Sequence, residues 1–89
     1  MAKLFVISVG GSIIVPEGID TSFLKQFRAL ILNQVKKGNK FILVAGGGHI
    51  ARMYQQASQQ AHPSRAEKDE LGIAATALNA LLLKTLFHN

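Results

Sequence analysis

The sequence contains no cysteine, no tryptophan, two prolines and only five acidic residues among its 89. The lack of cysteine excludes disulfide bonds and thiolate metal sites, and it fits a reducing compartment. No apolar run reaches the ~18–20 residues that a membrane-spanning helix needs, because Asn79 and Lys84 interrupt the most apolar stretch. The N-terminus has no small-residue cleavage site behind a long apolar segment, so it does not resemble a signal peptide. We therefore expect a cytoplasmic protein that does not cross a membrane.

Apolar residues are abundant. They make up 48% of the chain, which favours a packed globular body over disorder. A chain of this length forms one small domain at most. Ten lysines and arginines against five acidic residues give a net charge of +5. These basic residues are scattered and have no interleaved aromatics, which argues against nucleic-acid binding. The positive field suits anionic small molecules, although a solvated basic surface explains it equally well.

Two segments have the composition of buried parallel strands. Residues 3–9 and 40–45 are almost continuously apolar and rich in β-branched side chains, as expected for strands that are covered on both faces. Residues 10–20 contain glycine and proline and are predicted to form a loop. A helical segment separates the two strands, and this order predicts a right-handed parallel crossover.

Three helices are expected around these strands. The first begins after the N-cap Asp20, repeats apolar residues at helical spacing, and ends at Gly38, which can adopt a left-handed cap. The second covers residues 49–61 and is broken by Pro63. Each helix thus has an identifiable signal at one or both of its ends.

The last helix begins with a capping box, formed by Ser64 and Glu67, and is expected to run to about Phe87. It is apolar on most sides, which is typical of a helix buried between layers or at a subunit contact. Two parallel strands leave unpaired edges, and parallel sheets normally have several strands with helices on both faces. We therefore expect the chain to be part of a larger α/β unit.

Glycine clusters follow both predicted strands. Residues 46–48 are three consecutive glycines, and residues 10–12 read Gly-Gly-Ser. Turns at the carboxyl ends of parallel strands are where α/β proteins bind ligands, and glycine lets backbone N–H groups approach a phosphate closely. Two such turns side by side suit two anionic groups held together, as phosphoryl transfer requires. A tight turn that needs positive φ is the alternative explanation for either cluster alone.

A few other polar side chains are candidates for ligand contacts. Arg52, one turn beyond the three glycines, can fork onto phosphate oxygens, or it can be an ordinary exposed arginine. Asp69, near the start of the last helix, can hold a ribose hydroxyl or simply favour the helix dipole. His49, His62 and His88 have no metal-ligand spacing, so a metal site built from them is not expected.

Two common nucleotide-binding patterns do not fit. The pattern G-x-x-x-x-G-K-[ST] is absent, which argues against ATPases of that class. Residues 46–51 do match G-x-G-x-x-A, and Asp69 lies about twenty residues further on. In a dinucleotide site, however, the glycines follow the first strand and the acidic residue ends the second. Here the glycines end the second strand and Asp69 begins a helix.

Three blocks, "VISVGGSIIVPEGID", "ILVAGGGHIARMY" and "EKDELGIAATALNALLL", resemble in order and spacing the N-terminal part of uridylate (UMP) kinases of the amino-acid-kinase superfamily, above all the archaeal-type branch. The resemblance covers nearly the whole chain. It implies an α/β fold, a parallel-sheet three-layer sandwich of the carbamate-kinase-like type, of which residues 1–89 form the incomplete N-terminal, phosphate-acceptor part. It also implies transfer of the γ-phosphoryl of ATP, with Mg²⁺, to UMP in pyrimidine nucleotide synthesis. Family members are cytoplasmic and commonly hexameric.

The resemblance also implies roles for individual residues. Gly10, Gly11 and Ser12 would form the phosphoryl-transfer loop. Gly47 and Asp69 would contact UMP, and Gly48 and Arg52 would contact the phosphates of ATP. No Mg²⁺ ligand is identifiable in the chain. The apolar last helix would pack in the subunit contact of the family.

The chain departs from the family pattern in two ways. Many bacterial relatives have a lysine where this chain has Ser8, so the cation that balances the transferring phosphoryl is left open. Family members are also much longer, and their C-terminal part binds the base of ATP and completes the sheet. One alternative is a non-catalytic nucleotide- or anion-binding module that self-associates to cover its edges. The others are a purely structural module that docks a complementary chain, and a sister kinase acting on acetylglutamate, carbamate or isopentenyl phosphate.

Overall fold

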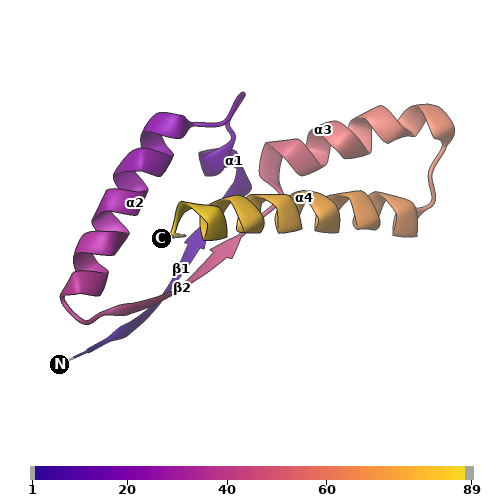
Figure 1. Ribbon diagram of the computed structural model, residues 1–89. Coiled ribbons are helices and arrows are strands. Elements are labelled where there is room, and N and C mark those ends of the chain that lie inside the picture. The colour runs from indigo at the N-terminus through magenta and orange to yellow at the C-terminus, as the bar shows by residue number, and fades with distance from the viewer. Residues whose placement is uncertain (1, 88–89) are drawn as a thin grey trace.

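The computed structural model describes residues 2–87 (Figure 1). In chain order the elements are β1 (Leu4–Val9), α1 (Gly11–Ile14), α2 (Thr21–Lys36), β2 (Lys40–Ala45), α3 (Gly48–Ser58), the 3₁₀ turn η1 (Gln59–Ala61) and α4 (Arg65–Leu86). Both predicted strands and all three long helices are present, with bounds that differ from the predictions by a few residues. His88, one of the candidate histidines, lies outside the described residues.

The helix-end signals act as predicted. The Asp20 side chain accepts a hydrogen bond of 2.9 Å from the backbone N–H of Phe23 and so caps α2. At the other end of this helix, Gly38 has φ +92°, a conformation that glycine adopts readily. Both hydrogen bonds of the capping box at the start of α4 form between Ser64 and Glu67. The hydrogen bonds from the backbone N–H and hydroxyl of Ser64 lower the pKa of the Glu67 carboxyl.

The two strands pair in parallel, as the crossover requires. Their register matches Leu4 with Lys40 at one end and Val9 with Ala45 at the other. The two strands therefore end level with each other, and the glycine-containing segments that follow them begin at the same edge of the sheet. This alignment of the strand ends positions the candidate site.

The hydrophobic core lies on one face of the two strands. It is built from Val9 of β1, Ile14 and Val15 beside α1, Leu24 of α2 and Leu83 of α4, all at most 4% exposed. Helices α2 and α4 also contact each other, since the Arg28 guanidinium donates a hydrogen bond of 2.7 Å to the carbonyl of Leu86. Both helices thus pack against the face of the sheet that Ile7 and Leu43 share.

The opposite face of the strands is uncovered in residues 2–87. Leu4, Val6, Ile42 and Val44 are 61%, 66%, 51% and 48% exposed. The prediction that both faces are covered is therefore wrong for these residues. The side chains of this face are nevertheless those typical of a strand that is covered on both sides.

The prediction of an irregular loop over residues 10–20 is also wrong in part. Gly11–Ile14 form the one-turn helix α1, which begins directly after the strand. Its first residue has no side chain and its last, Ile14, is fully buried in the core. The local glycine content indicated a break in structure, whereas burial of Ile14 depends on contacts with elements distant in the sequence.

Helices α3 and α4 run side by side and extend away from the strands (Figure 1). The side-chain amide of Gln55 on α3 donates a hydrogen bond of 2.9 Å to the carbonyl of Lys68 on α4. Between them, His62 with φ +49° forms the bend before Pro63. Within residues 2–87, none of the helices combines the length and the apolarity that crossing a membrane demands.

Candidate functional site

The two glycine-containing turns meet at the carboxyl ends of the strands. Because Val9 is level with Ala45 in the sheet, Gly10 and Gly46 leave it at neighbouring positions. The turns are packed together without side chains between them. A methyl group added to Gly11 would lie 2.5 Å from the carbonyl oxygen of Gly46 and 2.7 Å from the nitrogen of Gly48. The structure thus brings residues 10–12 and 46–48 together, as the arrangement of the strands predicted.

Gly48 contributes to this contact in two ways. It has φ +53°, in the left-handed region that side chains disfavour. A methyl group added to it would meet the backbone nitrogen of Ser12 and the carbonyl carbon of Gly11. Glycine is therefore required here by conformation and by contact together, which explains the cluster more fully than a tight turn alone.

Arg52 connects the two turns. It lies on the first turn and a half of α3, and its guanidinium donates a hydrogen bond of 3.1 Å to the hydroxyl of Ser12. Both side chains are exposed. A guanidinium held at this point can donate its remaining N–H groups to an anion at the meeting point of the turns.

Helix α4 packs against the second glycine turn, residues 46–48. A methyl group added to Gly47 would lie 3.1 Å from the Thr76 hydroxyl and 3.4 Å from the carbonyl of Gly72. The side-chain amide of Asn79 donates hydrogen bonds of 2.8 Å and 3.5 Å to the carbonyls of Gly46 and Gly47. Gly72, Thr76 and Asn79 are spaced by four and three residues, which places them on one face of the helix.

These three residues of α4 are the part of the site that sequence reasoning missed. In the sequence, Asn79 interrupts an apolar stretch and belongs, with Gly72 and Thr76, to the block that resembles uridylate kinases, but no role is predicted for it. In the structure it is 3% exposed and its side-chain amide donates to the glycine turn. The signal was the spacing of one glycine and two polar residues along an otherwise apolar helix. The spacing does not show which segment this face of the helix contacts, because Gly46 lies 33 residues before Asn79 in the chain.

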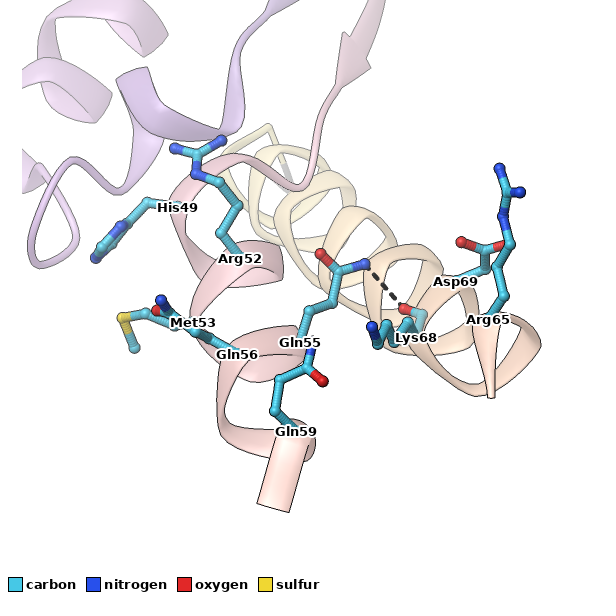
Figure 2. A pocket seen from close by; sticks show the side chains of 9 residues that line it. All are labelled: His49, Arg52, Met53, Gln55, Gln56, Gln59, Arg65, Lys68 and Asp69. Carbon is cyan, nitrogen blue, oxygen red and sulfur yellow. Dashed lines mark hydrogen bonds between the residues drawn. The ribbon is translucent and has the colours of Figure 1, made fainter. Parts of the chain in front are cut away.

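An open cavity of about 700 Å³ lies between α3 and the start of α4 (Figure 2). Two elements face each other across it, α3 with Arg52 and α4 with Asp69. The full lining consists of His49, Arg52, Met53, Gln55, Gln56, Gln59, Arg65, Lys68 and Asp69. This cavity is large enough for a nucleoside monophosphate, since small-molecule sites commonly measure ~300–1,000 Å³.

The charged side chains in the lining of the cavity are mostly cationic. The lining includes two arginines and a lysine but only one carboxylate, that of Asp69. Such a lining attracts an anionic ligand, and the carboxylate can accept hydrogen bonds from hydroxyl groups. Arg52 belongs both to this cavity and to the meeting point of the turns, whereas Asp69 lines only the cavity. Ser8, on the uncovered face of the sheet, belongs to neither.

No metal site is formed by the described side chains themselves. In residues 2–87, no group of three or more histidine, cysteine, aspartate or glutamate residues lies close enough to hold an ion. The donors that meet at the turns are backbone N–H groups and a guanidinium, which suit an anion rather than a cation. The turns therefore fit the phosphates of a nucleotide, and the residues present do not fit Mg²⁺ on their own.

The chain is similar to known proteins over most of its length. The amino acid kinase family matches residues 3–89. The chain is 37% identical over 78 residues to a uridylate kinase of Thermococcus sibiricus, which covers 88% of this chain and 34% of the relative. It is 41% identical over 78 residues to a uridylate kinase of Methanocorpusculum labreanum, covering 88% of this chain and 33% of the relative.

A solved structure has the same fold. The crystal structure of a uridylate kinase from Archaeoglobus fulgidus matches with a TM-score of 0.72 at 34% sequence identity, over 96% of this chain and 36% of that chain. The expected α/β class with a parallel sheet is thereby confirmed, and the chain spans about a third of the length of these relatives. On the match over residues 3–89, the chain belongs to the amino acid kinase family.

Proposed function

We propose that residues 1–89 are the phosphate-acceptor side of a kinase that transfers the γ-phosphoryl group of ATP to UMP, giving UDP. The contact between the two glycine turns, bridged by the hydrogen bond between Arg52 and Ser12, carries the proposal. It gives two phosphates a common site at the strand ends. The similar proteins of T. sibiricus and M. labreanum are named uridylate kinases, which supports UMP as the acceptor.

The residues divide between the two substrates. Gly10, Gly11 and Ser12 lie against the transferring phosphoryl group, and their backbone N–H groups hold its oxygens. Gly48 and Arg52 bind the phosphates of ATP. Gly47 and Asp69 bind UMP, with the Asp69 carboxylate accepting hydrogen bonds from ribose hydroxyls in the cavity. These assignments are proposals, supported by the arrangement of the turns and of the cavity.

Catalysis in this proposal is positioning and charge stabilisation. The transferring phosphoryl group carries its charge on three oxygens, and donors fixed beforehand stabilise that charge without rearranging. Arg52 supplies the positive charge that balances the transferring phosphoryl group, because its side chain is held between the loop at residues 10–12 and the cavity. Mg²⁺, which accompanies ATP in phosphoryl transfer, neutralises phosphate charge when it is bound.

The uncovered face of the strands supports the view that the chain is one side of a larger domain. We propose that the site for the base of ATP lies outside residues 1–89, and that the further strands and helices of the same fold cover Val6 and Ile42. Whether these belong to the same polypeptide or to a complementary C-terminal half, the 89-residue chain alone gives no phosphoryl transfer. We further propose that the kinase works in the cytoplasm as a homo-oligomer, in which the exposed apolar face of α4 at Leu78 and Leu81 forms the subunit contact.

Titration of the ¹⁵N-labelled chain with UMP tests the acceptor site. We expect amide resonances of residues 46–48 and 69 to shift, and the UMP affinity to fall about tenfold or more in Asp69→Asn, because this change removes a charge-assisted hydrogen bond of ~1.5–3 kcal/mol. In a parallel titration with ATP, Arg52→Ala should lower the affinity for ATP by a similar factor for the same reason. Lys25→Ala and Glu70→Gln make the same charge changes at exposed positions outside the cavity and serve as controls. Shifts that avoid these residues, or equal losses in the controls, would contradict the proposal.

A turnover assay tests whether phosphoryl transfer needs parts of the domain outside residues 1–89. The purified 89-residue chain, supplied with ATP, Mg²⁺ and UMP, is expected to form no UDP above the uncatalysed background. Robust turnover by this chain alone would show that the ATP site is complete within it. Acetylglutamate, carbamate and isopentenyl phosphate, tested in the same titration, distinguish the sister kinases, because none of them offers a ribose to Asp69.

The exposed apolar surfaces favour one second candidate, a binding module without catalysis. A stable oligomer of the chain that binds UMP and ATP tightly but remains inactive when its C-terminal counterpart is supplied would favour the module. Light scattering gives the oligomeric state. Assembly that is unchanged by Gly47→Val, together with no ligand binding at all, would indicate a purely structural role.

A further inference from the structure

Asn79 is the one buried polar residue among residues 2–87, and its side chain is committed to the glycine turn. It is 3% exposed, and its amide nitrogen donates hydrogen bonds of 2.8 Å to the carbonyl of Gly46 and 3.5 Å to that of Gly47. An amide buried among apolar residues destabilises a protein unless it is hydrogen-bonded. At this position the bond goes to the backbone of the proposed phosphate site rather than to the helix of Asn79 itself.

The direction of these two carbonyls determines the direction of the N–H groups that follow them. In a trans peptide, the C=O of one residue and the N–H of the next point in opposite directions, and no cis bond occurs in the described residues. A carbonyl of Gly46 drawn towards α4 therefore turns the N–H of Gly47 away from α4. The carbonyl of Gly47, which also accepts the first hydrogen bond of α3 from Ala51, does the same to the N–H of Gly48.

These N–H groups are without acceptors in the part of the chain that the structure describes. Neither the N–H of Gly47 nor that of Gly48 donates to a backbone or side-chain acceptor within residues 2–87. They begin helix α3, where N–H groups have no partner within the helix. Two donors are thus aimed away from α4 and have no protein acceptor within residues 2–87.

The close packing of α4 makes this hydrogen bond possible. A methyl group added to Gly47 would lie 3.1 Å from the Thr76 hydroxyl and 3.4 Å from the backbone carbonyl of Gly72, so the turn lies in van der Waals contact with the helix. Asn79 lies on the same face of the helix and reaches the carbonyls directly. A bulkier residue at position 76 would push the turn out of reach of the Asn79 amide.

We propose that Asn79 is a positioning residue, whose side-chain amide orients the Gly46–Gly47 and Gly47–Gly48 peptide planes so that their N–H groups face the phosphate. The inference rests on the proposed function, because it takes the second turn to be a phosphate site. It adds a residue that does not touch the ligand and acts through the backbone it holds.

The test compares UMP binding by the wild-type chain with binding by Asn79→Ala and by Asn79→Asp. Asn79→Asp is nearly isosteric but puts a carboxylate oxygen, which cannot donate, against the two carbonyls. We expect UMP affinity to fall about tenfold in Asn79→Ala, the fold-change that corresponds to ~1.4 kcal/mol, and further in Asn79→Asp. Ile31→Ala, which removes a side chain buried in α2 away from the turn, is the matched control for general loss of stability.

A spectroscopic readout separates orientation from stability. In the ligand-free chain, residual dipolar couplings of the Gly47 and Gly48 N–H vectors should change in Asn79→Ala and stay as in the wild type in Ile31→Ala. Wild-type couplings and affinity in Asn79→Ala, or an equal loss of affinity in Ile31→Ala, would overturn the inference and leave the proposed function standing. No UMP binding by the wild-type chain would overturn both.

A measurement on the wild-type chain remains informative if the variants do not fold. The side-chain amide protons of Asn79 should exchange with solvent at least tenfold more slowly than those of the exposed Asn33, and remain protected when UMP shifts the Gly47 and Gly48 amides. Exchange as fast as that of Asn33 would show that the hydrogen bond to the turn is not held, and the inference would be wrong.

Discussion

The two glycine turns have similar sequences, but glycine serves different purposes in them. In the first turn, Gly10 has ordinary extended backbone and only the side chain of Ile13 near the position of an added methyl group, whereas Gly11 is buried against the second turn. In the second turn, the nearest atom to a methyl group added at Gly46 would be 3.6 Å away, whereas one added at Gly47 would meet Ala51 of α3 at 2.7 Å as well as α4. Gly48 combines positive φ with contact to the first turn. Only some of the glycines are therefore required by the fold.

The turns also differ in what holds them. The first opens the short helix α1, whose last residue Ile14 is anchored in the apolar core. The second is anchored by hydrogen bonds from Asn79 to its carbonyls. An apolar anchor fixes where a turn lies, while a hydrogen bond to a carbonyl also fixes which way the peptide plane faces. The second turn is thus better suited to present N–H groups in a set direction.

Gly48→Ala should produce the largest effect on stability. It adds about 1–2 kcal/mol of left-handed strain and about 1–3 kcal/mol of overpacking, because the new methyl group would meet the backbone of Gly11 and Ser12. Gly46→Ala is the matched control, with its nearest atom at 3.6 Å. Chemical denaturation measures both free energies of unfolding, and equal losses would show that the turns do not touch as described.

Gly11→Ala should follow, with a loss of about 3 kcal/mol or less. The added methyl group would lie 2.5 Å from the Gly46 carbonyl oxygen, and backbone on both sides leaves little room to shift. Gly10→Ala meets only the flexible side chain of Ile13, at 3.7 Å, and should change the free energy of unfolding by less than about 0.5 kcal/mol. A destabilised Gly10→Ala with a tolerated Gly11→Ala would reverse the comparison of the two glycines.

Gly38→Ala isolates backbone strain from contact. Gly38 has φ +92°, but a methyl group there would meet nothing within 4 Å. We expect a loss of about 1–2 kcal/mol, from the unfavourable φ alone. The difference between Gly48→Ala and Gly38→Ala, measured in the same denaturation experiment, then reports the contact between the turns. If the two losses are the same, the contact contributes nothing measurable.

Much of the fold was predictable because its signals are local. The N-cap Asp20, the left-handed Gly38 and the capping box of Ser64 and Glu67 each involve residues within a few positions of one another. The level strand ends followed from the parallel arrangement, and so did the meeting of the turns. These features depend on short-range geometry or on general rules of α/β topology, which a single sequence shows.

The features that sequence reasoning missed depend on distant partners. The role of Asn79 depends on the carbonyls of Gly46 and Gly47, 33 and 32 residues earlier in the chain. In the sequence it is a break in an apolar pattern and a member of the block that resembles uridylate kinases, and neither feature identifies its partner. The exposure of Val6 and Ile42 depends on which other elements cover that face of the sheet. The sequence of an apolar strand is the same whether its second face is covered or not. The helix at Gly11–Ile14 depends on the burial of Ile14, which its glycine-rich neighbourhood conceals.

The start of α4 offers the smallest expected effect, and it contrasts with the turns because side chains, not their absence, hold it. Hydrogen bonds from Ser64 lower the pKa of Glu67 below its ordinary 4.5. The carboxylate therefore stabilises the folded state above pH 4.5, and this contribution is lost as the pH falls through the lower folded-state pKa.

Glu67→Gln keeps a capping side chain that does not titrate. Melting temperatures between pH 6 and 3 should show the advantage of wild type over Glu67→Gln shrinking with acidification, with Glu70→Gln as the control. A constant difference would show that the Ser64 hydrogen bonds do not depend on the charge of Glu67.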